Sequence, residues 1–454
     1  MQEAAQAPPA PQAMPFGQFL VALIQSFERE GVRLCVLRNY EGFAAGNIGR
    51  DVDLLILRSQ LPSVVRALGA IHGIRIVGFA ERHYVATVLV AGVSSAPNAR
   101  ALQIDFYLCL TWKGLPYLEA DLVVQSAICF PAGNSTFLVP SSVHEAIISL
   151  FAGLLLGGLL KEKYFLQAQR TFTSDRTEVI AALLPKFGLK ATTRMVDAVI
   201  AGNRHMVLAC VGQLRASLAS RNLAYRPISS IQNIARHYAR EIVARFTPED
   251  LETINILGLD WCKSTVIEGL MPTLRSSSVV VERRRSGPLQ PLALLSSGAT
   301  ETADVDAQTE DSSLSSMVRI VLWLLEEWRS QFIGDILPTL RICESYYYDL
   351  LFLPKSYRSA DRGWLARLVA KLLPSADLWI VLDHATNGLQ SMSEQVIPAQ
   401  TSAQLGAFRA LDEAGERFVV LDANQPSDRV IESAYITIID TLAQRADKRL
   451  KSRF

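Results

Sequence analysis

The sequence predicts an α+β domain with a helical extension, followed by an α/β domain built on a parallel sheet. Three observations favour this. A helical apolar pattern near the N-terminus leads into several short strand patterns, and the middle of the chain follows helical spacing almost throughout. Near residue 380 a continuous apolar strand ends in Asp, as buried strands of parallel sheets often do. The length of 454 residues suggests two or three domains.

The composition limits the classes of protein to be considered. Half of the residues are hydrophobic and a fifth are charged, so the chain can bury sizeable cores. The 45 Lys and Arg residues nearly balance the 44 Asp and Glu residues, which gives no strong signal for nucleic acid as a partner. The six cysteines are scattered without a Cys-x-x-Cys pair. We therefore expect a cytoplasmic protein without a disulfide framework or structural zinc.

Two stretches bear on targeting and membranes. Residues 1–14 are rich in Ala, Pro and Gln and lack the basic start and apolar core of a signal peptide, so we expect a disordered lead-in. The longest apolar stretch, residues 146–160, is interrupted by Ser149 and three glycines and is short for a bilayer span. We predict a buried helix there and no membrane span; membrane insertion is the alternative.

The first domain, residues 15–140, shows one helix, two strands, another helix and further strands. The expected helices cover residues 16–30 and 61–71, and the expected strands cover 34–37, 51–57, 74–79, 84–90 and 102–108. This succession is typical of an α+β unit on a small mixed sheet.

Asp51 and Asp53 begin the second of these strands. Because side chains alternate along a strand, both carboxylates should project from one face. Two converging carboxylates are costly unless a cation neutralises them, which favours a site for Mg²⁺ and nucleotide phosphates. A solvated Asp-x-Asp turn is the competing interpretation.

Asp105 lies between apolar and aromatic neighbours in a later strand. An acid in such a strand needs a partner or a metal ion. A third carboxylate beside the Asp-x-Asp pair is what a two-metal site for nucleotidyl transfer requires. An edge strand that turns Asp105 to water would explain the residue equally well.

Residues 16–165 resemble the nucleotidyltransferase superfamily, which has the polymerase-beta-like fold. Its pattern is a small-residue turn, an Asp-x-Asp strand and a third Asp on a later strand. The resemblance implies that Asp51, Asp53 and Asp105 are catalytic and hold Mg²⁺, and that a nucleoside triphosphate donates its nucleoside monophosphate to an acceptor. The superfamily's Gly-Ser turn appears here as Arg38-Asn39. The resemblance makes both residues nucleotide-binding, with Arg38 supplying a phosphate contact.

Residues 141–247 are predicted to form a helical domain. Ser142 and Glu145 have the spacing of a capping box at the start of the long apolar helix. Lys161 and Lys163 are expected to end that helix. The resemblance implies that such a domain supplies a lysine to the triphosphate, whereas favourable charge at a helix C-terminus is the simpler explanation.

Residues 248–454 resemble the thymidylate-kinase-like domain that follows such nucleotidyltransferases in some bacterial proteins. An apolar strand and a tight turn precede a helix that opens with Lys-Ser-Thr, as in a phosphate-binding loop. The loop is one residue short, and Cys262 stands where the glycine before the lysine belongs. The residues of this degenerate site are Gly258, Lys263, Ser264, Thr265 and Glu344.

Two further phosphate-handling elements are altered. Glu344-Ser345 stands where the related proteins carry Asp-Arg, and Leu389-Gln390 is followed by no basic pair. Since charge stabilisation is nearly all of kinase catalysis, these losses predict a pseudokinase.

Residues 283–316 are polar, small and net acidic after three arginines, which predicts a disordered insertion. Those arginines would bind phosphate or RNA, or simply be solvated.

The sequence thus predicts a magnesium-dependent nucleotidyltransferase with a pseudokinase domain. The alternative from another class is a non-catalytic nucleotide sensor or scaffold, with a protein partner bound through the kinase-like domain. An active nucleoside-monophosphate kinase is a third interpretation. The resemblance associates such proteins with surface-polysaccharide production; no residue pattern specifies the acceptor or the nucleotide.

Overall fold

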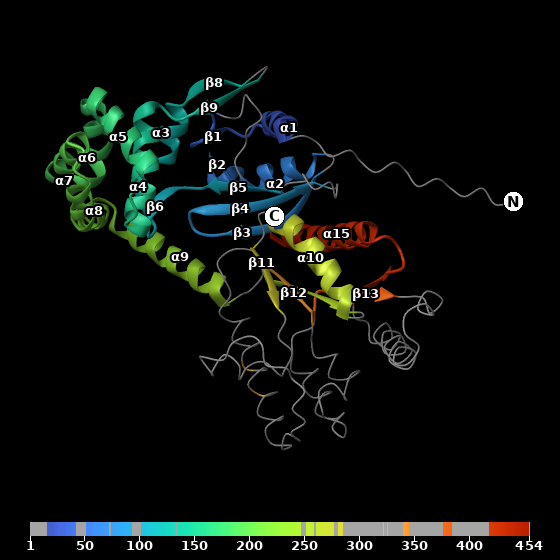
Figure 1. The fold of residues 1–454 in the computed structure, drawn as a ribbon. Coiled ribbons are helices and arrows are strands. Elements are labelled where there is room, and N and C mark those ends of the chain that lie inside the picture. Colours follow the sequence, from blue (N-terminus) through green and yellow to red (C-terminus); the bar gives the residue numbers. More distant parts are fainter. Residues whose placement is uncertain are drawn as a thin grey trace. The chain divides into compact units, whose positions relative to one another are not determined.

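The computed structural model covers all 454 residues. It describes residues 16–41, 51–71, 74–92, 101–132, 135–246, 251–257, 260–276, 280–284, 321, 325, 339–344, 376–383 and 417–453. The chain divides into two compact units (Figure 1). Unit 1 comprises Met1–Ser94, Ala101–Ala244 and Ala446–Phe454, and unit 2 comprises Ser95–Arg100 and Arg245–Arg445. The first two predicted domains therefore fall into one unit.

Unit 1 is built on a five-stranded mixed sheet. Its order is β1 (Leu34–Val36), β2 (Asp51–Ile56), β5 (Ala101–Tyr107), β4 (Val85–Gly92) and β3 (Ile74–Glu81). Strands β2 and β5 are parallel, and the other neighbouring pairs are antiparallel. All five strands lie where the sequence predicts strands, within two residues at each end.

One face of this sheet packs against α1 (Phe16–Arg29) and α2 (Leu61–Gly69). The core there combines Phe27 of α1 and Val64 of α2 with Leu54 of β2 and Phe106 of β5. Along β5 the exposure alternates strictly, with Leu102, Ile104 and Phe106 buried and the residues between them partly exposed. The period of two therefore turns the acids of β2 and β5 to the opposite face.

Two short hairpins follow the sheet. They are formed by β6 (Leu110–Trp112) with β7 (Leu115–Leu118), and by β8 (Ile128–Ala132) with β9 (Ser135–Val139). The short helix α3 (Ala120–Gln125) lies between them in the chain. These four strands do not stand out in the sequence, because three to five residues give too few alternations for a period to be recognised.

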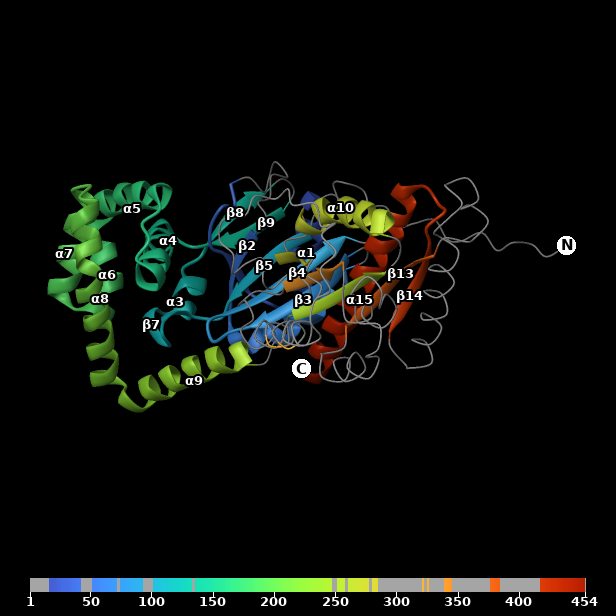
Figure 2. The same ribbon diagram turned by 60° about the horizontal axis from the view of Figure 1, so that its bottom comes forward.

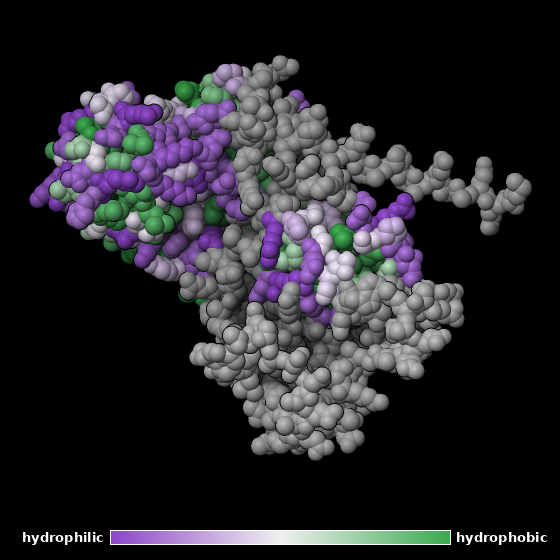
Figure 3. Space-filling model, viewed as in Figure 1, coloured by the Kyte–Doolittle hydropathy of each residue, from purple (hydrophilic) through white to green (hydrophobic). Residues whose placement is uncertain are grey.

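Six helices form the helical extension of unit 1. Figure 2 shows α5 to α8 gathered together. They are α4 (Ser142–Gly157), α5 (Glu162–Ser174), α6 (Arg176–Phe187), α7 (Leu189–Ile200), α8 (Arg204–Tyr225) and α9 (Pro227–Phe246). Their core contains Ile147, Phe151 and Leu154, so α4 is buried as predicted. Of the helices that the structure describes, none is long and apolar enough to span a membrane. Their outer face is mostly hydrophilic in the view of Figure 3.

Two predicted helix boundaries in this extension are wrong. The N-cap of α4 is Ser141 and not Ser142, since the Ser141 side chain accepts a hydrogen bond from the His144 backbone N–H at 3.4 Å. Helix α4 ends at Gly157, because Gly158 adopts a left-handed conformation with φ 64°. Lys161 and Lys163 therefore stand at the N-terminus of α5, not at the C-terminus of α4.

Unit 2 contains a five-stranded sheet in which every described pair of strands is parallel, which confirms the predicted parallel sheet. Its order is β11 (Val280–Arg284), β12 (Thr339–Cys343), β10 (Leu251–Leu257), β13 (Leu378–Asp383) and β14 (Phe418–Asp422). Its described helices are α10 (Asp260–Ser276) and α15 (Ser427–Arg453), and the last residues of α15 belong to unit 1.

Two arginines of the predicted insertion lie in a strand, and several other predicted segments lie outside the described residues. Arg283 and Arg284 pair with β12 as the end of β11, so they belong to the sheet and not to the expected insertion. The remainder of residues 283–316 lies outside the described residues, as do the lead-in 1–14, Gly258 and Leu389-Gln390.

Candidate active site

The predicted acids of unit 1 come together on the face of its sheet that lies opposite α1 and α2. In the parallel pairing of β2 and β5, Asp53 lies opposite Asp105 and Asp51 lies opposite Gln103. Neighbouring strands run about 4.8 Å apart, so these side chains project as neighbours. Asp51 is exposed at the start of β2, and Asp53 is 2% exposed.

Asp105 is held by two neutral donors. Thr87 Oγ1 on β4 donates to Oδ1 at 2.6 Å, and Gln103 Nε2 donates to Oδ2 at 3.0 Å. Burial raises the pKa of Asp105; these two hydrogen bonds lower it, and the charges of Asp53 and Asp51 raise it further. The influence of both acids on this pKa reflects how closely the three carboxylates lie.

Asp53 has one engaged oxygen and one free oxygen. The Nε of Arg38 donates to its Oδ2, and Oδ1 is buried without a hydrogen-bond partner among the residues that the structure describes. A buried carboxylate needs a compensating charge, and Arg38 provides it here. Arg38 stands two residues beyond β1, whose pairing with β2 brings it to this position.

A cluster of cations lies beside the acids. Arg38, Lys161 and Lys163 have their charged groups 5.6, 6.0 and 5.9 Å from the ring centroid of Tyr164. Lys163 Nζ also donates to Asn39 Oδ1 at 2.8 Å. The structure thus gathers all four predicted nucleotide-binding residues at one place, next to Asp53. Like charges repel, so such a gathering suits an anionic ligand.

The carboxylate oxygens of the three acids are of the type that binds a divalent cation, but the side chains are not arranged around one position. Among the described residues, no group of three or more Asp, Glu, His or Cys side chains is placed to hold a metal ion. The unpaired, buried Oδ1 of Asp53 is the kind of hard oxygen that Mg²⁺ takes, and Asp51 is exposed beside it. A cation bound by Asp53 would compete with Arg38 for this carboxylate.

Sequence reasoning missed several residues of this site. Gln103 was within reach, because it precedes Asp105 by two positions on one strand and so shares its face. Thr87 depends on the β4–β5 register, which places it opposite Asp105, and no local pattern gives that register. Tyr164 depends on how α5 packs against the turn after β1.

In the degenerate kinase site of unit 2, the charged side chains bind other groups of the protein. Lys263 on α10 is 5% exposed, and its Nζ donates to the backbone oxygen of Glu344 at 3.2 Å. The Glu344 carboxylate pairs with the guanidinium of Arg283 at the end of β11. Ser264 and Thr265 follow Lys263 in α10, partly buried and exposed.

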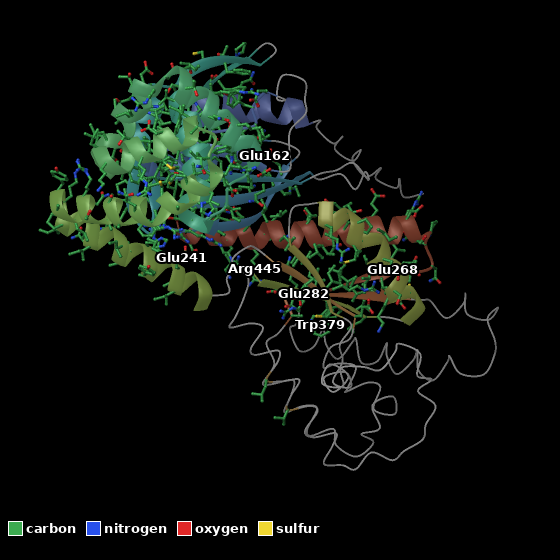
Figure 4. All side chains as sticks on the ribbon, turned by 60° about the vertical axis from the view of Figure 1, so that its left-hand side comes forward. Glu162, Glu241, Glu268, Glu282, Trp379 and Arg445 are labelled. Atoms are coloured by element: carbon green, nitrogen blue, oxygen red, sulfur yellow. The ribbon has the colours of Figure 1, made fainter. Side chains whose placement is uncertain are left out.

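These groups lie where parallel sheets usually bind ligands, at the carboxyl ends of the strands. Arg283 also approaches Glu268 on α10, with Nη1 3.9 Å from Oε1. Figure 4 labels Glu268 together with Glu282 of β11 and Trp379 of β13, which is fully buried.

Comparison with known proteins identifies no family. No protein-family model matches the sequence, and no curated protein matches it. Among solved structures, the chain is similar to a CCA-adding enzyme in complex with CTP, with 12% identity and a TM-score of 0.20 over 97% of this chain and 96% of that chain. A TM-score this low does not establish a shared fold, so the site is interpreted from its own geometry.

Proposed function

We propose that this protein is a magnesium-dependent nucleotidyltransferase that moves a nucleoside monophosphate from a triphosphate to an acceptor hydroxyl. One observation carries the proposal: the carboxylates of β2 and β5 lie directly beside the cations of the turn after β1 and of α5. A metal-bound triphosphate needs both kinds of group in one place, because acids hold the cation while basic side chains hold the phosphates.

Each residue of the site has a role that follows from its chemistry. Asp51, Asp53 and Asp105 would hold Mg²⁺, which when bound activates the attacking oxygen and steadies the leaving pyrophosphate. Arg38 offers a planar guanidinium suited to two phosphate oxygens, while Lys161 and Lys163 act as point charges. Thr87 and Gln103 orient Asp105 through their hydrogen bonds.

Unit 2 is proposed to be a pseudokinase domain that serves as a scaffold or nucleotide sensor. A phosphate-loop lysine must be free to reach a phosphate, whereas Lys263 is buried and donates to the main chain of Glu344. Arg283 is likewise bound to the Glu344 carboxylate. These internal contacts support the loss of phosphate handling that the sequence predicts.

The second candidate is a non-catalytic nucleotide-sensing or scaffold protein. The Arg38–Asp53 pair favours it, since the cation position of an active site is here taken by a side chain of the chain itself. Both candidates are compatible with surface-polysaccharide production, the setting that the sequence resemblance suggests.

Product formation tests the proposal. Purified protein is incubated with labelled nucleoside triphosphates, Mg²⁺ and candidate acceptors, comparing the wild type with Asp51→Ala plus Asp53→Ala. The matched control is Asp197→Ala, which removes a surface acid paired with Arg176. Product that the double variant loses and the control keeps is expected. Equal results for all three proteins, with no product, would overturn the enzyme proposal.

Calorimetry separates the two candidates. Nucleotide binding that requires Mg²⁺ and is lost in Asp105→Ala is expected of the enzyme. Binding that is the same with and without Mg²⁺ would favour the sensor instead. Phosphate transfer between nucleotides that Lys263→Ala abolishes would contradict the pseudokinase proposal.

A further inference from the structure

Glu145 is a buried acid of the helical extension that reaches the turn after β1. It lies in the first turn of α4 and is 7% exposed. Its Oε2 accepts a hydrogen bond from the Tyr40 hydroxyl at 2.8 Å, and its Oε1 accepts one from Gln167 Nε2 at 2.8 Å. Both carboxylate oxygens are therefore engaged by neutral donors, one of which belongs to the phosphate-binding turn proposed above.

A buried carboxylate at this position is costly. Removing an ion from water is unfavourable unless a counter-charge is close. Among the described residues no cation forms an ion pair with Glu145, and the N-terminus of α4 compensates only in part. An apolar side chain would fill the same space more cheaply. Packing alone therefore does not explain why an acid stands here.

The turn that Glu145 contacts has a backbone that must be held in place. Asn39 adopts φ 60°, a left-handed conformation that is uncommon outside glycine and that asparagine tolerates better than most residues. Contacts from the surroundings help to hold such a turn in one conformation. Lys163 binds the Asn39 side chain, and Tyr40 is the next residue along the chain.

Tyr40 is anchored at its ring and at its hydroxyl. The ring centroid lies 4.8 Å from that of Phe130 and 6.3 Å from that of Phe137 in edge contacts. These contacts hold the ring, and the hydrogen bond to Glu145 holds the hydroxyl. A hydrogen bond to a carboxylate is stronger than one to a neutral acceptor, so Glu145 fixes the hydroxyl better than an amide would.

We propose that Glu145 is a positioning residue for nucleotide binding: through Tyr40 it holds the turn that presents Arg38 and Asn39 to the phosphates. Gln167 orients the Glu145 carboxylate from α5. The helical extension thus contributes to the site both directly, through Lys163, and indirectly, through Glu145. The inference rests on the proposed function and adds to it a residue that never touches the substrate.

Nucleotide affinity provides the first test. Tyr40→Phe and Glu145→Leu are each expected to raise the Kd for a nucleoside triphosphate roughly tenfold, the effect of one charge-assisted hydrogen bond. The double variant should be no worse than either single variant, because both remove the same contact. Glu145→Gln keeps a neutral acceptor for Tyr40, so its Kd should lie between those of the wild type and Glu145→Leu.

Two matched controls accompany this cycle. Glu178→Leu removes an exposed acid on α6, and Tyr435→Phe removes a buried hydroxyl on α15 that has no hydrogen-bond partner within the described part of the chain. Both should leave the Kd unchanged. Effects of Tyr40→Phe and Glu145→Leu that multiply in the double variant, or that appear only as a lower melting temperature, would overturn the inference.

Hydrogen exchange without nucleotide separates this inference from the proposed function. In mass spectrometry of the full chain, peptides covering residues 38–41 should exchange faster in Tyr40→Phe and Glu145→Leu than in the wild type and Glu178→Leu. Unchanged exchange in Glu145→Leu would refute the positioning role. Faster exchange in a protein whose wild type binds no nucleotide would confirm that Glu145 anchors the turn and refute the nucleotide function instead.

Discussion

The guanidinium of Arg38 pairs with the buried carboxylate of Asp53, and this ion pair ties the turn after β1 to the strand that carries two acids. The Arg38 side chain is 22% exposed and the Asp53 side chain 2%, so the pair is shielded from water on the carboxylate side. Shielding strengthens the interaction and makes the loss of either partner costly. Substituting either partner of this pair therefore tests the electrostatics of the site.

Removing Arg38 should make the stability of the protein depend on magnesium. Arg38→Met leaves Asp53 buried without its counter-charge, which should lower the free energy of unfolding by about 3–5 kcal/mol. Mg²⁺ that binds Asp53 should restore part of this loss, because a ligand of the folded state stabilises it. Urea unfolding of both proteins with and without Mg²⁺ measures the effect.

The control for this prediction is Arg66→Met. Arg66 forms a surface pair with Glu30 and its side chain is 65% exposed. Such pairs contribute about 0–1 kcal/mol, so little destabilisation and no response to Mg²⁺ are expected. The same Mg²⁺ response in both variants would show that the ion does not act at Asp53.

Asp53→Asn should abolish nucleotidyl transfer while preserving the shape of the side chain. Losing one group that stabilises the reacting charges typically costs at least about 100-fold in kcat. The matched control is Asp197→Asn, which changes an exposed acid in the same unit. Initial rates at saturating nucleotide and Mg²⁺ measure the effect, and a rate for Asp53→Asn within a factor of two or so of the control would contradict the catalytic role.

Gly114 should tolerate no side chain. It adopts φ 83° in the β6–β7 turn, and a Cβ there would lie 2.4 Å from the backbone oxygen of Asn233 on α9. Gly114→Ala should destabilise the protein by at least about 1–3 kcal/mol, through backbone strain and the clash together. At Gly212 of α8, a Cβ would meet no described atom within 4 Å apart from its own stretch of helix. Gly212→Ala should instead be neutral or stabilising by up to about 1 kcal/mol. Thermal unfolding compares the two, and equal melting temperatures would contradict this packing.

His83 should make the protein less stable in mild acid. Burial, with the nearby charges of Arg58 and Arg240, lowers the pKa of His83 to about 4, and His237 lies 5.8 Å away between ring centroids. Below the ordinary histidine pKa of about 6.5, the unfolded chain binds a proton that the folded chain refuses. The free energy of unfolding therefore falls as the pH drops from about 6.5 to about 4, by at most about 1.4 kcal/mol per pH unit.

His83→Gln removes this proton linkage. Denaturant unfolding between pH 7 and pH 4 should give a steeper acid loss for the wild type than for the variant. The difference between the two curves of unfolding free energy against pH gives the contribution of His83 alone, because the carboxylates that titrate in this range are present in both proteins. Parallel curves would show that His83 keeps an ordinary pKa in the folded protein.

Much of the architecture was predictable because it depends on local patterns. The helix over residues 16–29, the five strands of the first sheet, and β10 and β13 of the second sheet follow from apolar spacing and from uninterrupted apolar runs. The wrong boundaries lie at helix ends, where Ser141 and Ser142 offer the same hydroxyl and only the backbone conformation selects one of them as N-cap.

The features of the candidate site likewise divide into those that depend on local sequence and those that depend on tertiary contacts. The sequence by itself determined that Asp51 and Asp53 share a face and that Asp105 lies on a strand, because side-chain alternation and apolar runs are local properties. Only the tertiary structure decided that β2 and β5 are neighbours, that Arg38 neutralises Asp53 and that Glu145 binds Tyr40 across 105 positions of sequence. Such contacts join segments that are distant in the chain, so they depend on register and packing, which no local pattern encodes.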